Sequence, residues 1–289
     1  MRLVQLQHVK GRRRIAFVSE PYLIFLETYS SMYELARSVL SSEVSFERLV
    51  TDSISDEKIL YDEAYYARSE WRLLPSFDHP YDVQHCILSG TGLTHKASAE
   101  NRQAMHKEGK GEPLTDSMKM YQMGIDGGKP PKGNIGVQPE WFYKGNGSLL
   151  RGHGEFLEVP AFGHDGGEEA EIAGVYIIDE KGKPWRIGFT VANEFSDHVM
   201  ERKNYLYLAP SKIRTCSIGP ELVVRSDFRS IQGRVSLSRE GIEYWTNDIY
   251  SGADYMVHSL ENLEYHHFKY DNHRISGQAH IHFLSLIHI

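Results

Sequence analysis

The sequence has few cysteines and no long apolar run, and each shortage excludes a class of protein. Two cysteines in 289 residues, Cys86 and Cys216, exclude a disulfide framework and a four-cysteine zinc site. No stretch approaches the roughly 18 apolar residues of a membrane-spanning helix, and residues 1–7 lack the apolar region of a secretory signal. We therefore expect a cytoplasmic protein with no membrane partner.

Positive charge is also scarce. The chain carries 32 Lys and Arg against 39 Asp and Glu, a net charge of −7. Because a general nucleic-acid-binding protein needs a basic face, we expect no nucleic-acid partner. Hydrophobic residues make up 40% and charged residues 25% of the chain, which is typical of a globular protein. The length suits one large or two modest domains.

The first 80 residues are predicted to form a small α+β domain. Short apolar runs at 3–6, 15–18 and 22–26 predict strands. The apolar spacing over 29–53 predicts a helix after Ser30-Ser31 and a second, short helix from Ser45. Residues 54–80 show no clear period and end in a segment with two prolines, which marks a boundary. We therefore divide the chain into domains of residues 1–80 and 81–289.

Strand signals dominate the second part of the chain. We expect strands at 83–88, 174–178, 186–191 and 221–224, a helix over 97–108 and a glycine-rich loop over 124–136. A loop of that length often serves as an active-site lid. Many short strands with few long helices predict an α+β fold that is mainly β.

An acidic cluster precedes one of these strands. In a strand, side chains two residues apart face the same side, so Glu169 and Glu171 point together. Two adjacent carboxylates repel unless a cation lies between them, and oxygen ligands favour Mg²⁺, Mn²⁺ or Ca²⁺ over zinc. The alternative is the solvated edge of a strand, because Glu-x-Glu alone is common.

Three further residues carry possible chemistry downstream and upstream of this cluster. Glu194, at the end of a later strand, could supply a third carboxylate. Lys212 could balance the charge or neutralise a developing enolate, or it could be a surface lysine. His95 follows two glycines and suits proton transfer, although a loop histidine held by hydrogen bonds is the commoner case. The other fourteen histidines of the 15 are interpreted as packing or surface residues.

These residues, in this order, resemble the fumarylacetoacetate hydrolase superfamily over roughly residues 83–283. The resemblance rests on His95 after a glycine turn, the Glu-x-Glu strand, a Gly-aromatic-Thr-x-x-Asn-acidic segment and a lysine before Gly-Pro. Residues 114–120, 133–144 and 193–198 are similar to the GguC-like branch of that superfamily, which is associated with sugar-acid catabolism, including arabinose use.

The resemblance implies a mixed β-roll catalytic domain in a homodimer, with one Mg²⁺ or Mn²⁺ in each site. By position, the metal ligands are Glu169, Glu171 and Glu194. The implied catalytic and substrate-binding residues are His95, Lys212, Glu100, Lys144, Asn193 and Arg214.

The chain departs from the superfamily pattern at several places. Glu194 stands where most relatives have Asp, and Asp197-His198 replaces an Arg-Asp pair. The glutamate that partners the superfamily histidine is Ser98 here, so Glu100 is the available substitute. Residues 284–289 match what one reading frame of a common sequencing adapter encodes. We therefore expect the natural chain to continue differently after Phe283, where the superfamily has a substrate-binding segment.

The function expected from these features is a metal-dependent reaction of a 2-oxo acid. Bound through its carboxylate and keto oxygens, such a substrate would be activated for enolate formation at C3. We favour a hydro-lyase that dehydrates a 2-keto-3-deoxy sugar acid of the pentonate type. One alternative is a C–C bond hydrolase of acylpyruvate-like diketo acids. Another is a non-catalytic module that binds a sugar acid or has a regulatory role.

Overall fold

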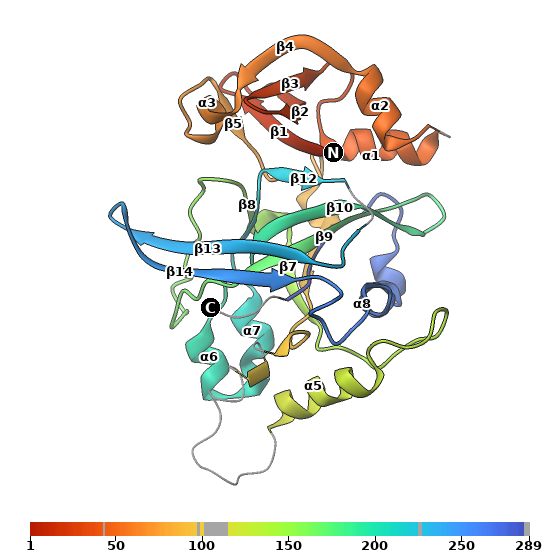
Figure 1. Ribbon diagram of the computed structural model, residues 1–289, viewed down its shortest axis with the longest axis vertical. Coiled ribbons are helices and arrows are strands. Elements are labelled where there is room, and N and C mark those ends of the chain that lie inside the picture. The colour runs from red at the N-terminus through yellow and green to blue at the C-terminus, as the bar shows by residue number, and fades with distance from the viewer. Residues whose placement is uncertain (43, 97–98, 101–114, 225–226, 286–289) are drawn as a thin grey trace.

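The computed structural model describes residues 1–42, 44–96, 99–100, 115–224 and 227–285. Within these ranges the fold is α+β and mainly β, as predicted (Figure 1). A large mixed sheet has the strand order β4-β3-β2-β1-β12-β10-β9-β15-β6-β7, and β5, β8 and β11 pair beside this path. No described helix is long and apolar enough to cross a membrane.

The first strands and helices agree with the sequence. They are β1 (Arg2–His8), β2 (Arg13–Ser19), β3 (Tyr22–Leu26), α1 (Met32–Ser41) and α2 (Phe46–Asp52). Ser31 and Ser45 cap the two helices by accepting hydrogen bonds from backbone N–H groups in the first turn. The prediction of irregular structure over 54–80 is wrong in part, since this stretch holds β4 (Ile54–Leu60), α3 (Tyr61–Tyr65) and β5 (Trp71–Leu73).

The middle of the chain contains η1 (Val83–His85), β6 (Cys86–Gly90), α5 (Asp116–Gly127), β7 (Phe142–Asn146), η2 (Gly147–Leu149) and β8 (Leu150–Arg151). The helix predicted over 97–108 lies mostly outside the described residues. The loop predicted over 124–136 starts later than expected, because α5 continues to Gly127. Gly124 is needed for packing: a Cβ there would lie 2.7 Å from the Val257 side chain.

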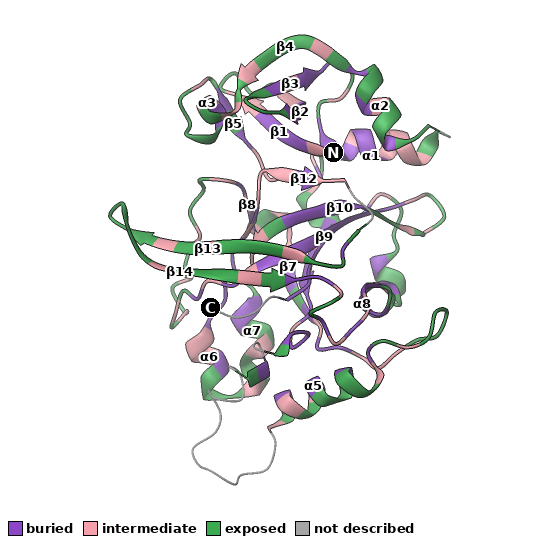
Figure 2. Ribbon diagram, viewed as in Figure 1, coloured by how far each residue is buried: buried purple, intermediate pink, exposed green. Residues whose placement is uncertain are grey.

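The remaining elements are β9 (Ala170–Ile178), β10 (Pro184–Asn193), α6 (His198–Lys203), η3 (Tyr205–Tyr207), α7 (Leu208–Lys212), β11 (Cys216–Ile218), β12 (Glu221–Val223), β13 (Ile231–Arg239), β14 (Ile242–Ser251), α8 (Leu260–Phe268), η4 (Asp271–His273) and β15 (Ala279–Phe283). The three strands predicted between 174 and 224 are present as β9, β10 and β12. The hairpin of β13 and β14 was not predicted. It forms a separate two-stranded sheet that is exposed over most of its length (Figure 2).

Two junctions organise the large sheet. Strand β1 pairs with β12, so strands of the first 80 residues continue the sheet formed by the later chain. The division into two domains at residue 80 stays a prediction. Strand β15 lies between β6, to which it is parallel, and β9, to which it is antiparallel. Every residue of β15 is buried, so this strand forms the centre of the part of the sheet that carries the acidic residues.

Candidate functional site

Three glutamates meet at one end of the β9–β10 pair. In the β9–β10 ladder Ala170 lies opposite Asn193, and the Glu194 N–H donates to the Glu169 carbonyl at 2.8 Å. The register brings Glu194 level with the Glu-x-Glu segment, and each of the three side chains offers a carboxylate oxygen within 4.8 Å of the others. All three residues are buried. Among the described residues, this is the one group of acidic, histidine or cysteine side chains close enough to hold a metal ion.

Burial and mutual repulsion make the three carboxylates hard to ionise together. Burial, opposed by the Lys212 ammonium and assisted by Glu169, raises the pKa of Glu194 to about 7. Burial and then the charges of Glu194 and Glu169 raise the pKa of Glu171 well above its ordinary value. A cation between the carboxylates would favour their charged forms.

Lys212 supplies one positive charge to this cluster. The side chain is 1% exposed, and its Nζ donates to Glu169 Oε1 at 2.8 Å and to Glu194 Oε2 at 3.1 Å. Further contacts join Nζ to Ser196 Oγ at 3.0 Å and to Glu201 Oε1 at 3.4 Å. One ammonium cannot neutralise three carboxylates, so the cluster retains a deficit of positive charge.

The donor set fits a hard divalent cation. The Glu194 Oε1 atom is buried and has no hydrogen-bond partner among the described contacts. Glu171 Oε2 accepts a single bond, from the Ser285 N–H at 2.9 Å. Oxygen-only ligands of this kind suit Mg²⁺ or Mn²⁺, while zinc prefers nitrogen and sulfur.

Residues 90–92, which we call the wall segment, pack directly against this cluster. A Cβ on Gly90 would lie 2.2 Å from Glu194 Oε1, and a Cβ on Gly92 would lie 1.7 Å from Glu140 Oε2. Glu140 is buried and accepts a hydrogen bond from the Tyr205 hydroxyl at 2.8 Å. The wall segment thus packs against Glu194 at Gly90 and against a fourth buried carboxylate, that of Glu140, at Gly92. Glu140 lies in the segment 133–144 that carries the superfamily resemblance, but it was not predicted as a site residue.

His95 follows the wall segment and is buried. Its Nδ1 lies 2.9 Å from Thr94 Oγ1, and its Nε2 has no hydrogen-bond partner among the described contacts. Burial, with a smaller effect of Lys129, lowers the pKa of His95 to about 4, so the ring is neutral at pH 7. No described contact links His95 to the three glutamates.

Glu100 does not pair with His95 among the described contacts. Its side chain is 57% exposed and lies 3.5 Å from the Lys96 ammonium. The pairing of Glu100 with His95 therefore stays a prediction.

The three residues predicted to bind substrate make hydrogen bonds or ion pairs to protein groups around the site. Lys144 Nζ donates to three backbone carbonyls, those of Glu194, Phe195 and Lys212, at 2.8–3.1 Å. Since an ammonium has three protons to donate, this side chain is committed to the backbone.

Asn193 and Arg214 also contact protein groups. The Asn193 Oδ1 atom accepts a hydrogen bond from the Glu169 N–H at 3.1 Å, and its amide donates to Glu168. Arg214 is buried and pairs with Asp197 Oδ2 at 2.9 Å. Both residues position the segments that carry the glutamates, while a direct contact with substrate stays a prediction.

His198 is a contact of the cluster that the sequence did not single out for a role. Its Nε2 lies 2.9 Å from Glu169 Oε1. Burial opposes protonation, yet the hydrogen bond and charge of Glu169 raise the pKa of His198 above its ordinary value. A Cβ at Gly167 would lie 2.4 Å from the His198 ring, so a glycine there leaves room for the histidine. The replacement of Arg-Asp by Asp197-His198 is the sequence signal that could have led to it.

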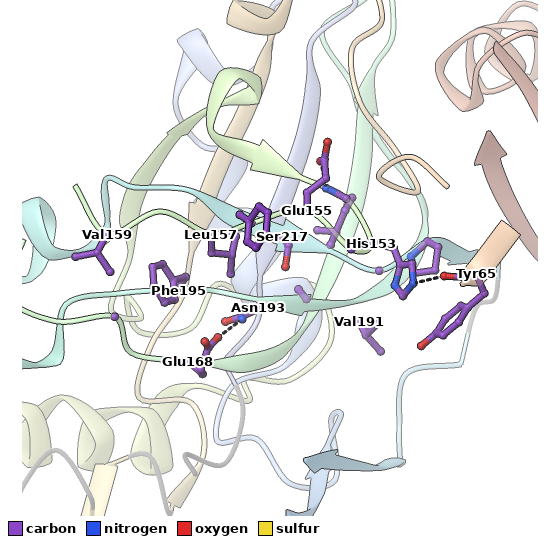
Figure 3. A pocket seen from close by; sticks show the side chains of 18 residues that line it. Tyr65, His153, Glu155, Leu157, Val159, Glu168, Val191, Asn193, Phe195 and Ser217 are labelled. Atoms are coloured by element: carbon purple, nitrogen blue, oxygen red, sulfur yellow. Dashed lines mark hydrogen bonds between the residues drawn. The ribbon is translucent and has the colours of Figure 1, made fainter. Parts of the chain in front are cut away.

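A cavity of about 700 Å³ lies beside the cluster, on the side of β10 that exposes Val191 (Figure 3). Asn193 and Glu168 line the cavity and are hydrogen-bonded to each other, and His153 lies against Tyr65 at its far end. Asn193 therefore lines the cavity and is also hydrogen-bonded to the backbone of Glu169, one of the three glutamates. None of the three metal-ligand candidates lines the cavity itself.

A comparison with known proteins bears on this geometry. No family model matches the chain. A curated 2-dehydro-3-deoxy-D-arabinonate dehydratase of Saccharolobus solfataricus is 30% identical over 118 residues, which are 39% of this chain and 38% of that protein. The match thus spans well under half the length of this relative.

Solved structures cover almost the whole chain. A hexagonal crystal form of 2-keto-3-deoxyarabinonate dehydratase superposes with a TM-score of 0.68 at 18% identity, over 98% of this chain and 87% of that one. A complex of the dehydratase with magnesium and 2,5-dioxopentanoate gives 0.66 at 18% identity over the same shares. The chain therefore has the same fold as these dehydratase structures. The resemblance stated from the sequence agrees with this fold. A 5-carboxymethyl-2-hydroxymuconate delta-isomerase from Mycobacterium smegmatis superposes at a lower TM-score of 0.53, with 12% identity over 100% of this chain and 91% of that one.

Proposed function

We propose that this protein is a divalent-metal-dependent hydro-lyase that dehydrates a 2-keto-3-deoxy sugar acid of the pentonate type. The observation that carries the proposal is the buried cluster of Glu169, Glu171 and Glu194 with Lys212 in contact. The similarity to a 2-dehydro-3-deoxy-D-arabinonate dehydratase supports the choice of substrate class.

Glu169, Glu171 and Glu194 are the residues that would hold Mg²⁺ or Mn²⁺. When bound, such a cation would supply Lewis-acid chemistry at the keto group of a 2-oxo acid. Lys212 donates to two of the ligands and so fixes their orientation. The same ammonium provides positive charge close to where negative charge develops on the substrate.

Water loss requires that a proton leave C3 and that hydroxide leave C4. The C3–H and C4–O bonds break, a double bond forms between C3 and C4, and the proton and hydroxide together make one water molecule. The resulting enone then isomerises to 2,5-dioxopentanoate: C5 and its hydroxyl each lose one proton, C3 and C4 each gain one, and the double bond moves to the C5 oxygen. Two buried groups close to the wall segment are suited to move these protons. They are the neutral His95 ring, whose Nε2 accepts a proton, and the Glu140 carboxyl held by Tyr205.

The test is proton NMR of the purified protein with MgCl₂ and 2-keto-3-deoxy-D-arabinonate in D₂O. We expect the C4 hydroxyl to be lost without cleavage of the carbon chain, and 2,5-dioxopentanoate to accumulate. Release of pyruvate would instead indicate the C–C bond hydrolase. Binding without deuterium exchange at C3 or turnover would indicate a non-catalytic module and overturn the proposal.

We also infer the assembly and location from the superfamily. A homodimer in the cytoplasm is the expectation, and the exposed apolar side chains of Phe156, Val159 and Val191 around the cavity are suited to burial between subunits. Light scattering of the purified protein tests the dimer: a monomer at micromolar concentration would contradict it.

A further inference from the structure

A buried histidine holds the wall segment from the side opposite the glutamates. The two ring nitrogens of His282 lie 2.8 Å from Ser89 Oγ and 2.7 Å from Thr91 Oγ1. None of these three side chains is more than 1% exposed. Since both ring nitrogens are engaged, the ring and the two hydroxyls fix one another.

The pairing of strands explains why this contact reaches the site. In the parallel ladder of β6 and β15, His282 is opposite Ser89 and Phe283 is opposite Gly90. The Thr91 N–H also donates to the Phe283 carbonyl at 3.0 Å. Side chains alternate along a strand, so Ser89 and Thr91 face the histidine while Gly90 faces the other way. On that other side a Cβ of Gly90 would lie 2.2 Å from Glu194 Oε1.

Neighbouring rings fix His282 in turn. The Trp141 indole N–H, which can only donate, lies 3.2 Å from His267 Nδ1, so the proton of the neutral His267 ring is on Nε2. That Nε2 then donates to His280 Nδ1 at 3.0 Å, and the His267 ring stacks on His282 with centroids 4.4 Å apart. These histidines do not form a metal site, since the glutamates are the single candidate group in the described chain.

We propose that His282 is a positioning residue that sets the orientation of the Glu194 carboxylate through Ser89, Thr91 and the backbone of Gly90. Glu194 Oε2 is held by Lys212, whereas Oε1 has no hydrogen bond among the described contacts. The position of Oε1 is therefore set by packing against Gly90 and the Phe142 ring that lies beside it. The inference rests on the proposed function only in that Glu194 is taken as a metal ligand.

The sharpest test compares Thr91→Val with Thr91→Ser. Valine keeps the shape of threonine but removes the hydroxyl that His282 contacts, and serine keeps the hydroxyl. Hydrogen–deuterium exchange of the peptide that covers residues 88–95 reports directly how firmly His282 holds the wall segment. Titration with Mn²⁺ by calorimetry, without substrate, reports the effect on the ligand.

We expect Thr91→Val to exchange faster in residues 88–95 and to bind Mn²⁺ at least about 10-fold more weakly. Substitutions of residues that orient metal ligands commonly have an effect of this size. Thr91→Ser should restore both properties to within about threefold of the wild type. In an activity assay, Thr91→Val should lower kcat more than it changes KM. A purely structural role would lower the unfolding temperature and leave the Mn²⁺ affinity unchanged.

A second pair of variants separates this contact from general damage to the core. His282→Phe removes both hydrogen bonds and keeps a ring. His280→Phe makes the same change two residues earlier on the same strand, where the ring contacts His267 and not the wall segment. We expect clearly weakened Mn²⁺ binding for His282→Phe and a smaller loss for His280→Phe, which touches His282 only through His267.

The outcomes distinguish this inference from the proposed function. Unchanged exchange of residues 88–95 in Thr91→Val and His282→Phe overturns the inference, whatever the metal data show. Faster exchange with unchanged Mn²⁺ affinity also overturns it, because the contact of His282 with the wall segment then does not act on Glu194. A wild type that binds no Mn²⁺ overturns the metal-dependent function, together with the role of His282 toward a metal ligand.

Discussion

Replacing Gly90 by alanine is the smallest change that should disturb the proposed metal site. A Cβ at this position would lie 2.2 Å from Glu194 Oε1 and 2.6 Å from the Phe142 ring. Because ordinary contacts begin near 3.4 Å, the carboxylate or the strand must move by about 1 Å, which exceeds the roughly 0.5 Å tolerance of a preorganised site. Overpacking of this kind also costs about 1–3 kcal/mol of stability.

The assay is Mn²⁺ binding by isothermal titration calorimetry on folded protein. We expect Gly90→Ala to weaken binding at least about 10-fold, equivalent to about 1.4 kcal/mol. Gly233→Ala is the matched control, since its Cβ would meet only the Ile249 side chain at 3.3 Å, in the exposed β13–β14 hairpin. That variant should bind Mn²⁺ as the wild type does.

Two results would refute this reasoning. If Gly90→Ala is folded and binds Mn²⁺ with wild-type affinity, the wall segment does not constrain Glu194. If Gly233→Ala weakens binding equally, the effect comes from a general loss of stability and not from the contact with the carboxylate.

Three more predictions follow from the same contacts. His95→Asn should retain more dehydratase activity than Glu171→Gln, because a general base contributes about 10²–10⁴-fold and we expect the metal to contribute more; equal losses in steady-state assays would contradict this. Lys144→Met should lower the free energy of unfolding in urea by about 3 kcal/mol or more, because three backbone carbonyls lose a buried donor; a loss below about 1 kcal/mol would show that these bonds matter little. Burial lowers the pKa of His95 and His258 to about 4 and that of His282 to about 3, against about 6.5 in the unfolded chain. The unfolded state therefore binds more protons below pH 6.5, and each histidine should cost about 2 kcal/mol of stability by pH 5; denaturant midpoints that do not fall from pH 7 to pH 5 would contradict this.

The sequence predicted the residues of the acidic cluster better than their contacts. The two-residue period of a strand was enough to place Glu169 and Glu171 side by side. Glu194 could be named as a possible third carboxylate, but assigning it to the same site required the superfamily resemblance, because the register of β9 against β10 is a long-range property. The contacts of Lys144 could not be predicted, since its place in the sequence does not show that its ammonium will meet three backbone carbonyls.

The fold shows the same division between local and long-range information. Serine caps and apolar spacing located α1 and α2, because helix starts depend on neighbouring residues. The β13–β14 hairpin was missed although Glu240-Gly241, both with positive φ, joins two alternating runs and is a hairpin signal. The glycines of α5 predicted a loop, whereas Gly124 is a point of close contact with Val257. Such a contact between distant segments leaves no periodic pattern.

The most direct test of the central claim is a crystal structure of the protein soaked with MnCl₂, with data collected at the manganese absorption edge. The account predicts an anomalous peak within ligand distance of carboxylate oxygens of Glu169, Glu171 and Glu194, and the loss of that peak in Glu171→Gln. A map with no peak among these three side chains, or with a peak elsewhere that persists in Glu171→Gln, would contradict it.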